Sequence, residues 1–198
     1  MYLNLTPDSR LPTPKRKASG FTLIELLVVM AILGILTTIV ASSFSSSQEK
    51  AHDARRKSDL EGLAKALEVY YNDNNRYPQS NSGNLNVTDC GATGANPCSW
   101  GGEFTDTAGT VYMAKVPEET SSARRFYYTT DAQFQSYAMY TRLENDLDKD
   151  IPRDAAEANQ YYSGSNCGPT FTGASSGCNY AISSTNTKPE SFFPLVVE

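Results

Sequence analysis

Residues 21–44 form an apolar run in which the only charged side chain is Glu25, at the fifth position. A run of this length can cross a membrane as a single helix. A carboxylate in hydrocarbon costs about 2.5 to 3.5 kcal/mol even on lenient insertion scales, so it needs a partner. We therefore expect residues 21–47 to form a membrane-spanning helix in which Glu25 is paired.

Small residues stand directly before this run. Ala18, Ser19 and Gly20 precede Phe21, whereas a secretory signal is cut behind its apolar stretch, which is then discarded. Cleavage after Gly20 would keep the hydrophobic helix on the product and create a new amine on Phe21, one helical turn from Glu25. A plain signal anchor explains the apolar run but neither the glycine nor the acid.

The segment from Lys17 to Glu25, K-A-S-G-F-T-L-I-E, resembles the class III leader of type IV pilins and of the related pseudopilins of type II secretion systems. The resemblance implies that a membrane prepilin peptidase removes residues 1–20 by cleaving between Gly20 and Phe21, and that the new terminus is methylated. It also implies a homopolymer whose filament core is built from residues 21–47 of each subunit. In it, Glu25 pairs with the terminal amine of the adjacent subunit. A buried charge without its partner costs several kcal/mol, so Glu25 would set the register of subunit addition.

The charge distribution indicates the orientation of the precursor. The formal net charge is −5; residues 1–20 contain four basic residues and one acid, a net of +3, which leaves −8 for the mature chain. Basic residues before an apolar run favour a cytoplasmic leader and a large domain across the membrane. The acidic mature chain argues against direct nucleic-acid binding, which depends on Lys and Arg.

An amphipathic pattern continues the helix beyond the apolar run, over residues 48–78. The serines at 45–47 disfavour a helix only mildly, and no proline occurs between 48 and 74. The sequence N-D-N-N-R-Y-P at 72–78 ends the helix, because asparagine tolerates left-handed geometry and Pro78 disfavours a helical Tyr77; this ending resembles that of major pseudopilins. A single helix from Phe21 to Asn74 would be about 80 Å long. Its apolar stripe at i, i+3, i+4 spacing consists of Leu60, Leu63, Ala64, Leu67, Tyr70 and Tyr71, and its reverse face carries Lys57, Glu61, Lys65 and Glu68.

Residues 79–198 are expected to form a globular head braced by disulfides. No C-x-x-C pair occurs and the single histidine, His52, is distant, so a zinc site has little support. An even number of cysteines in an exported domain favours disulfides. Three pairings are possible, and we favour the two local ones because the loops that they close are rich in Gly, Asn and Ser. The cysteines are Cys90, Cys98, Cys167 and Cys178.

Short strands are predicted in this head at 111–116, 125–130 and 135–143, and the last two should form an antiparallel hairpin. Alternation places Phe126 and Tyr128 on one face of the strand at 125–130 and Tyr127 on the other. In the strand at 135–143 it places Tyr137 and Met139 on one side and Ala138 and Tyr140 on the other. A small antiparallel sheet would then lie across the apolar stripe of the long helix. The predicted fold class is α+β, with a pilin-like arrangement.

One acidic window is a candidate metal site. Carboxylates at positions 1, 3, 5, 9 and 12 match the oxygen ligands of an EF-hand-type calcium loop, although Ile151 stands where such a loop has glycine and the preceding segment is strand-like. A short helix over residues 154–162 would complete the pattern. Major pseudopilins, which the chain resembles, often bind calcium in this region; the alternative is a solvated acidic loop. The candidate ligands are Asp146, Asp148, Asp150, Asp154 and Glu157.

Catalytic motifs are missing from the sequence: it contains no nucleophile elbow and no Gly-rich phosphate loop. His52, Arg55, Arg56 and Lys57 are interpreted as a solvated face of the helix. A membrane-tethered enzyme is therefore only a remote alternative to a non-enzymatic filament subunit.

Two kinds of filament remain open. A disulfide-braced head of about 120 residues, within the usual size range of a domain, favours a type IV pilus-like surface fibre, whereas the helix ending and the calcium loop favour a major pseudopilin of type II protein secretion. In both, the precursor would be a single-pass membrane protein with a cytoplasmic N-terminus, handled by prepilin peptidase and by inner-membrane assembly machinery. The assembled product would be an extracellular pilus or a periplasmic pseudopilus.

Overall fold

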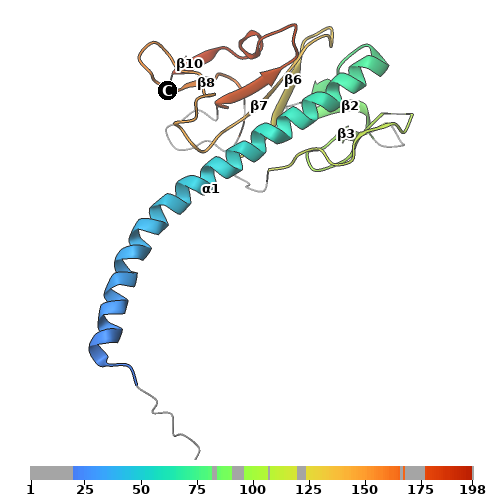
Figure 1. Ribbon diagram of the computed structural model, residues 1–198. Coiled ribbons are helices and arrows are strands. Elements are labelled where there is room, and N and C mark those ends of the chain that lie inside the picture. Colours follow the sequence, from blue (N-terminus) through green and yellow to red (C-terminus); the bar gives the residue numbers. More distant parts are fainter. Residues whose placement is uncertain are drawn as a thin grey trace, which may run out of the picture. The chain divides into compact units, whose positions relative to one another are not determined.

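The computed structural model describes residues 20–81, 84–90, 96–106, 108–119, 124–165, 167 and 177–197. Residues 1–19 of the predicted leader lie outside this range. The chain divides into two compact units, Met1–Phe44 and Ser45–Glu198, here termed the first unit and the second unit. The predicted α+β class is confirmed, since a long helix is followed by antiparallel sheets (Figure 1).

Helix α1 runs from Leu23 to Asn74 without interruption, so the serine run does not break it. Thr37 and Thr38 donate their hydroxyl hydrogens to the carbonyls of Gly34 and Ile35, at 2.9 and 2.8 Å, which satisfies these hydroxyl groups within the helix. Over the part of the chain that the structure describes, no helical stretch has both the length and the apolar content that crossing a membrane requires.

The predicted end of the helix is confirmed. Asn75 follows the last helical residue with a φ of 52°, in the left-handed region that asparagine tolerates. Its amide still donates to the carbonyl of Tyr71 at 2.8 Å, which satisfies one of the final carbonyls of the helix. Tyr77 is then buried beside the helix that it has just left.

The predicted hairpin forms the centre of the second unit. Strands β6 (Tyr127–Thr130) and β7 (Tyr137–Thr141) pair in an antiparallel register that joins Tyr127 to Tyr140 and Thr130 to Tyr137. Strand β9 (Tyr180–Ser183) pairs with the other edge of β7, so the sheet order is β6-β7-β9. Figure 1 shows this sheet beside the C-terminal half of α1.

Shorter antiparallel pairs surround this sheet. Strands β1 (Gln79–Asn81), β2 (Asn84–Cys90) and β3 (Asn96–Cys98) form one sheet in chain order. Strand β4 (Phe104–Thr105) pairs with β5 (Val111–Met113), and β8 (Gln160–Tyr162) pairs with β10 (Leu195–Val197), which follows the 3-10 turn η1 (Pro189–Ser191).

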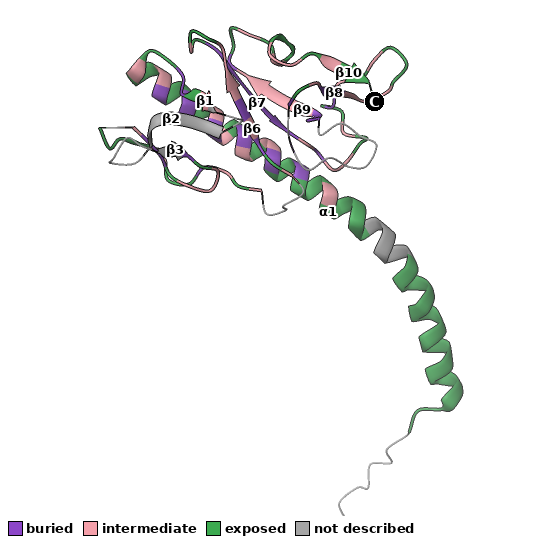
Figure 2. Ribbon diagram, turned by 180° about the vertical axis from the view of Figure 1, so that it is seen from behind, coloured by how far each residue is buried: buried purple, intermediate pink, exposed green. Residues whose placement is uncertain are grey.

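The main core lies between α1 and one face of the central sheet. Of the predicted helical stripe, Leu60, Leu63, Leu67 and Tyr70 are buried, while Ala64 and Tyr71 are partly buried and pack against the core. Figure 2 shows the buried residues on the side of α1 toward β6 and β7. At about 25 cal/mol per Å² of apolar surface, each large side chain buried here contributes about 1.5 to 3 kcal/mol. The members contributed by the helix and by the strands next to it include Leu60, Leu63, Leu67, Tyr70, Phe126, Tyr128, Tyr137 and Met139.

The opposite face of the sheet is covered as well. Ala138 and Tyr140, which alternate with Tyr137 and Met139 along β7, pack against residues from the end of the chain. The predicted assignment of side chains to the two faces of this strand is therefore confirmed. The second core also holds Tyr162, Cys167 and Cys178, with Tyr127, Phe192, Phe193 and Leu195 packed around it.

Two sequence-based predictions of local structure were wrong. The strand predicted over 111–116 is only β5, Val111–Met113, and it pairs with β4 in a separate sheet. The helix predicted over 154–162 is instead a turn followed by β8. Asp154 accepts hydrogen bonds from the amides of Ala156 and Ala158 at 2.9 and 2.8 Å, and this local side-chain capture competes with a helix.

Candidate functional site

The predicted processing junction lies at the start of α1. Gly20 and Phe21 precede the helix and are exposed, Phe21 with 85% of its surface accessible. A Cβ atom added to Gly20 would meet no atom within 4 Å. Packing within the described chain therefore does not require glycine at this position.

Glu25 is held in the first turn of α1 by a reciprocal contact with Thr22. The amide of Glu25 donates to the Thr22 hydroxyl at 3.3 Å, and the amide and hydroxyl of Thr22 both donate to Glu25 Oε2 at 3.4 Å. This arrangement is a capping box, which satisfies amides that the helix itself leaves unpaired. The T-x-x-E pattern at 22–25 signals this box, and our sequence reasoning missed it.

The described part of α1 in the first unit exposes its apolar side chains. These residues present a continuous apolar surface rather than scattered single side chains, and such surfaces mark sites of association. Those with about half or more of their surface accessible include Leu23, Ile24, Leu26, Leu27, Met30, Ile32, Leu33, Ile35 and Leu36.

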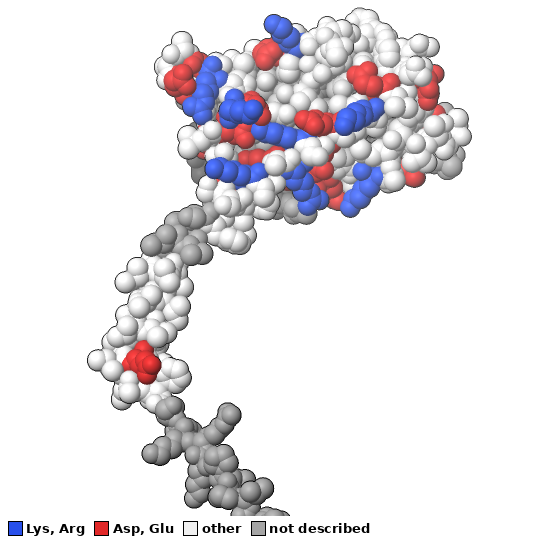
Figure 3. Space-filling view, in the orientation of Figure 1, with Lys and Arg blue, Asp and Glu red and all other residues white. Residues whose placement is uncertain are grey.

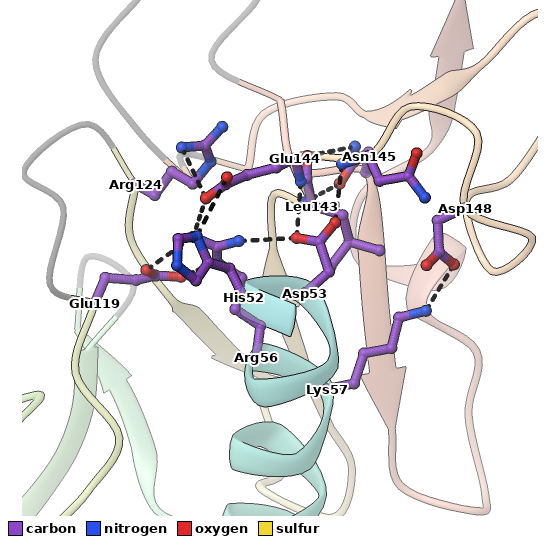
Figure 4. A network of polar contacts seen from close by, with 11 residues as sticks. His52, Asp53, Arg56, Lys57, Glu119, Arg124, Leu143, Glu144, Asn145 and Asp148 are labelled. Atoms are coloured by element: carbon purple, nitrogen blue, oxygen red, sulfur yellow. Dashed lines mark hydrogen bonds and ion pairs between the residues drawn. The ribbon is translucent and has the colours of Figure 1, made fainter. Parts of the chain in front are cut away.

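A buried ionic network fastens α1 to the rest of the second unit (Figure 4). The Arg56 guanidinium is only 7% exposed and donates to three carboxylates: Asp53 at 2.8 Å, Glu119 at 2.6 Å and Glu144 at 2.7 Å. Glu119 lies beyond β5 and Glu144 follows β7, so one side chain of the helix joins two segments far apart in the sequence. His52 Nδ1 lies 3.4 Å from the second oxygen of Glu144.

Asp53 belongs to the same network and also accepts hydrogen bonds from the backbone that follows β7. Its two carboxylate oxygens accept the amides of Glu144 and Asn145, each at 2.8 Å, and the residue is 1% exposed. The interpretation of His52, Arg55, Arg56 and Lys57 as a solvated face is therefore wrong for Arg56, which is buried against acids of its own chain. It is wrong for Lys57 too, whose side chain is 17% exposed and contacts Asp148 and Asp150.

The charges in this network stabilise each other. Burial alone would lower the pKa of Arg56, but its hydrogen bonds to Glu119 and Glu144, and their charges, raise it above its ordinary value. Burial would raise the pKa of Glu144, whereas the hydrogen bond from Arg56 and the charge of Arg124 bring it below its ordinary value. Both shifts keep the groups ionised at neutral pH.

The five acids of the candidate calcium loop point to different partners. Asp148 and Asp150 both contact Lys57, Asp154 binds amides of its own turn, and Glu157 is 84% exposed at 3.9 Å from Arg153. Asp146 contributes its backbone carbonyl to Asn159 and Arg153. Among the described residues, no three acidic, histidine or cysteine side chains are grouped so that they could hold a metal ion.

The cysteines brace the second unit. Cys167 and Cys178 form a disulfide, which is the local pairing favoured from the sequence. Both are fully buried in the second core. Cys98 is also disulfide-bonded, while the side chain of Cys90 lies outside the described residues.

Two family models match the chain in succession. One, described as the prokaryotic N-terminal methylation motif, matches residues 15–41. The other, described as type II secretion system (T2SS), protein G, matches residues 43–137. The predicted resemblance to type IV pilins and pseudopilins is confirmed. The matched ranges contain Gly20, Glu25 and Arg56, whereas the acidic loop and the Cys167–Cys178 bridge lie beyond them.

Similar curated proteins carry the name type II secretion system core protein G. That of Aeromonas hydrophila is 46% identical over 69 residues, which are 35% of this chain and 48% of the relative. Those of Escherichia coli K12 and Vibrio cholerae are 40% identical over 67 residues and 41% identical over 68, covering 34% of this chain and 46% and 47% of the relatives. The chain thus spans about half the length of these relatives. No solved structure matches it.

Proposed function

We propose that this chain is the major pseudopilin of a type II secretion system, a structural subunit that polymerises and is not an enzyme. The observation that carries the proposal is the succession of a methylation motif over 15–41 and a protein G region over 43–137. The sequence alone favoured a type IV pilus-like fibre, with the secretion pseudopilus as the alternative. The named relatives favour the secretion pseudopilus.

Processing fits this proposal. Because nothing in the described chain packs against Gly20, the need for glycine there would come from another protein, the prepilin peptidase that cleaves before Phe21. The exposed junction is accessible to such an enzyme. Cleavage would leave a free amine on Phe21, close to the carboxylate of Glu25, and this amine would then be methylated.

The first unit would mediate the assembly of subunits. Its apolar helical surface is exposed in the single chain and would be buried among the same helices of neighbouring subunits. In that apolar bundle, Glu25 would exchange part of its capping contact with Thr22 for the terminal amine of an adjacent subunit, because a buried carboxylate requires compensation. The precursor would await assembly in the inner membrane, and the polymer would extend into the periplasm with the assembly machinery at its base.

The second unit would form the outer surface of this polymer. Basic and acidic side chains are interleaved over the face of the second unit seen in Figure 3. A mixed surface of this kind suits solubility and contacts between subunits better than binding of nucleic acid, which requires a concentration of Lys and Arg.

Deletion of the gene in its native host tests the proposal. We expect exported proteins to disappear from the culture medium, while surface fibres and twitching motility are retained, and a plasmid copy to restore export. Retained export with loss of surface fibres would overturn the secretion proposal and support the type IV pilus alternative. Retention of both would contradict the two filament proposals together.

A further inference from the structure

Lys57 lies at the point where the acidic loop meets α1. Its side chain is 17% exposed, and its ammonium nitrogen lies 2.6 Å from Asp148 Oδ1 and 2.6 Å from Asp150 Oδ2. The ring centroid of Tyr180, on β9, lies 5.3 Å from the same nitrogen. Figure 4 shows Lys57 reaching from α1 to Asp148.

This ammonium has the charge and position that the two carboxylates need. Asp148 and Asp150 lie within hydrogen-bond distance of a single nitrogen, so they are close enough to repel each other unless a cation stands between them. A lysine ammonium is a compact point charge with three donors, which can serve both carboxylates and still face the Tyr180 ring.

The loop around these acids is ordered by its own backbone. Asp148 Oδ1 also accepts the amide of Asp150 at 2.9 Å, and the amide of Asp148 donates to the carbonyl of Asn145 at 2.9 Å. Ile151, at the position where a calcium loop would have glycine, is buried. The turn is therefore closed by hydrogen bonds and an apolar anchor, without a glycine.

We propose that Lys57 is the built-in cation of this acidic loop, so that the loop is held to α1 by the chain itself and does not depend on calcium. The sequence pattern of spaced acids predicted a metal; the structure instead brings a lysine from 91 residues away in the chain to Asp148. This inference does not rest on the proposed function, because it concerns only the stability of the second unit.

Thermal unfolding of the full-length chain in detergent tests the proposal. Trp100 is the only tryptophan and packs against Phe126 in the main core, so its fluorescence reports unfolding of the second unit. The wild-type midpoint should be the same in excess calcium and in chelator. Lys57→Met should lower the midpoint by about 5 °C, since it removes two ion pairs, of which the one to Asp148 is partly buried. The control Lys65→Met, on an exposed position of the same helix, should leave the midpoint unchanged.

A triple variant separates charge from packing. The triple variant Lys57→Met/Asp148→Asn/Asp150→Asn removes the two carboxylates that repel each other together with the cation. Its melting midpoint should therefore recover most of the fall that Lys57→Met alone produces. A triple variant as unstable as Lys57→Met would mean that the lysine stem acts by packing, which overturns the proposal. A wild-type midpoint that rises in calcium, or a Lys57→Met midpoint equal to that of Lys65→Met, would overturn it as well.

Discussion

We expect the substitution Asp53→Asn to lower the free energy of unfolding of the second unit by about 3 to 5 kcal/mol. The Asp53 carboxylate is buried and accepts three hydrogen bonds, from Arg56 and from the amides of Glu144 and Asn145, all at 2.8 Å. An asparagine has nearly the same shape but replaces one acceptor oxygen by an NH2 group. That group would face a donor, and the buried Arg56 would lose one of its compensating charges.

The magnitude follows from the burial of these groups. A hydrogen bond to a charged group contributes about 1.5 to 3 kcal/mol, and removal of one partner from a buried ion pair costs about 3 to 5 kcal/mol. The two figures overlap rather than add, because they describe the same contacts. For a chain of this size, the loss corresponds to a fall of about 6 to 20 °C in the melting midpoint.

Urea and thermal unfolding followed by Trp100 fluorescence measure this loss. Asp59→Asn is the matched control: Asp59 lies on the same helix, 3.6 Å from an Arg55 side chain that is 71% exposed, and its loss should cost at most about 0.5 kcal/mol. Amide hydrogen exchange adds a local readout, since the amides of Glu144 and Asn145 should exchange faster in Asp53→Asn. Equal stabilities of the two variants would refute the reasoning.

Further predictions concern acid, the disulfide and the N-terminus. The pKa of Glu144 is lowered in the folded chain, so its contribution to stability is present above the pKa of the unfolded chain and is lost as the pH falls through the folded pKa. Glu144→Gln should flatten this acidic part of a plot of urea midpoint against pH, and an unaltered plot would contradict the assignment. Cys167→Ser/Cys178→Ser should lower the free energy of unfolding in urea by about 2.5 to 3 kcal/mol, the loop-closure value for a bridge of this short span. An unchanged urea midpoint would argue against a stabilising role of this bridge. Gly20→Leu should leave the precursor uncleaved, so a mature mass in mass spectrometry would rule out the predicted junction. Glu25→Ala should be cleaved but should form few filaments in electron micrographs; a wild-type yield would exclude its pairing role.

Local signals sufficed for much of the fold. The i, i+3, i+4 stripe predicted which side of α1 is buried, because a helix repeats every 3.6 residues whatever packs against it. The alternation of Tyr137 and Met139 with Ala138 and Tyr140 predicted the two faces of β7, because successive side chains of a strand point to opposite faces of the sheet. Asn75 ends the helix because asparagine tolerates the left-handed region, and Pro78, three residues later, indicates the same boundary in the sequence.

The polar contacts of the helix could not be obtained in this way. Arg56 and Lys57 look like ordinary surface residues, and their partners Glu144 and Asp148 lie 88 and 91 residues further along the chain. The acids of the loop are only a candidate metal site at the level of the sequence, because their spacing is the only information that it gives about them. Whether a carboxylate faces solvent, an ion or a lysine depends on which segment folds against it.

The sequence by itself therefore determined the features that depend on near neighbours: the leader motif ending at Gly20, the apolar run with Glu25, the long helix and the hairpin. The tertiary structure alone decided that Arg56 is buried among three carboxylates and that Lys57 stands between Asp148 and Asp150. The reason is physical, since backbone geometry and side-chain periodicity act over a few residues, whereas electrostatic compensation acts between any groups that folding brings within a few ångströms.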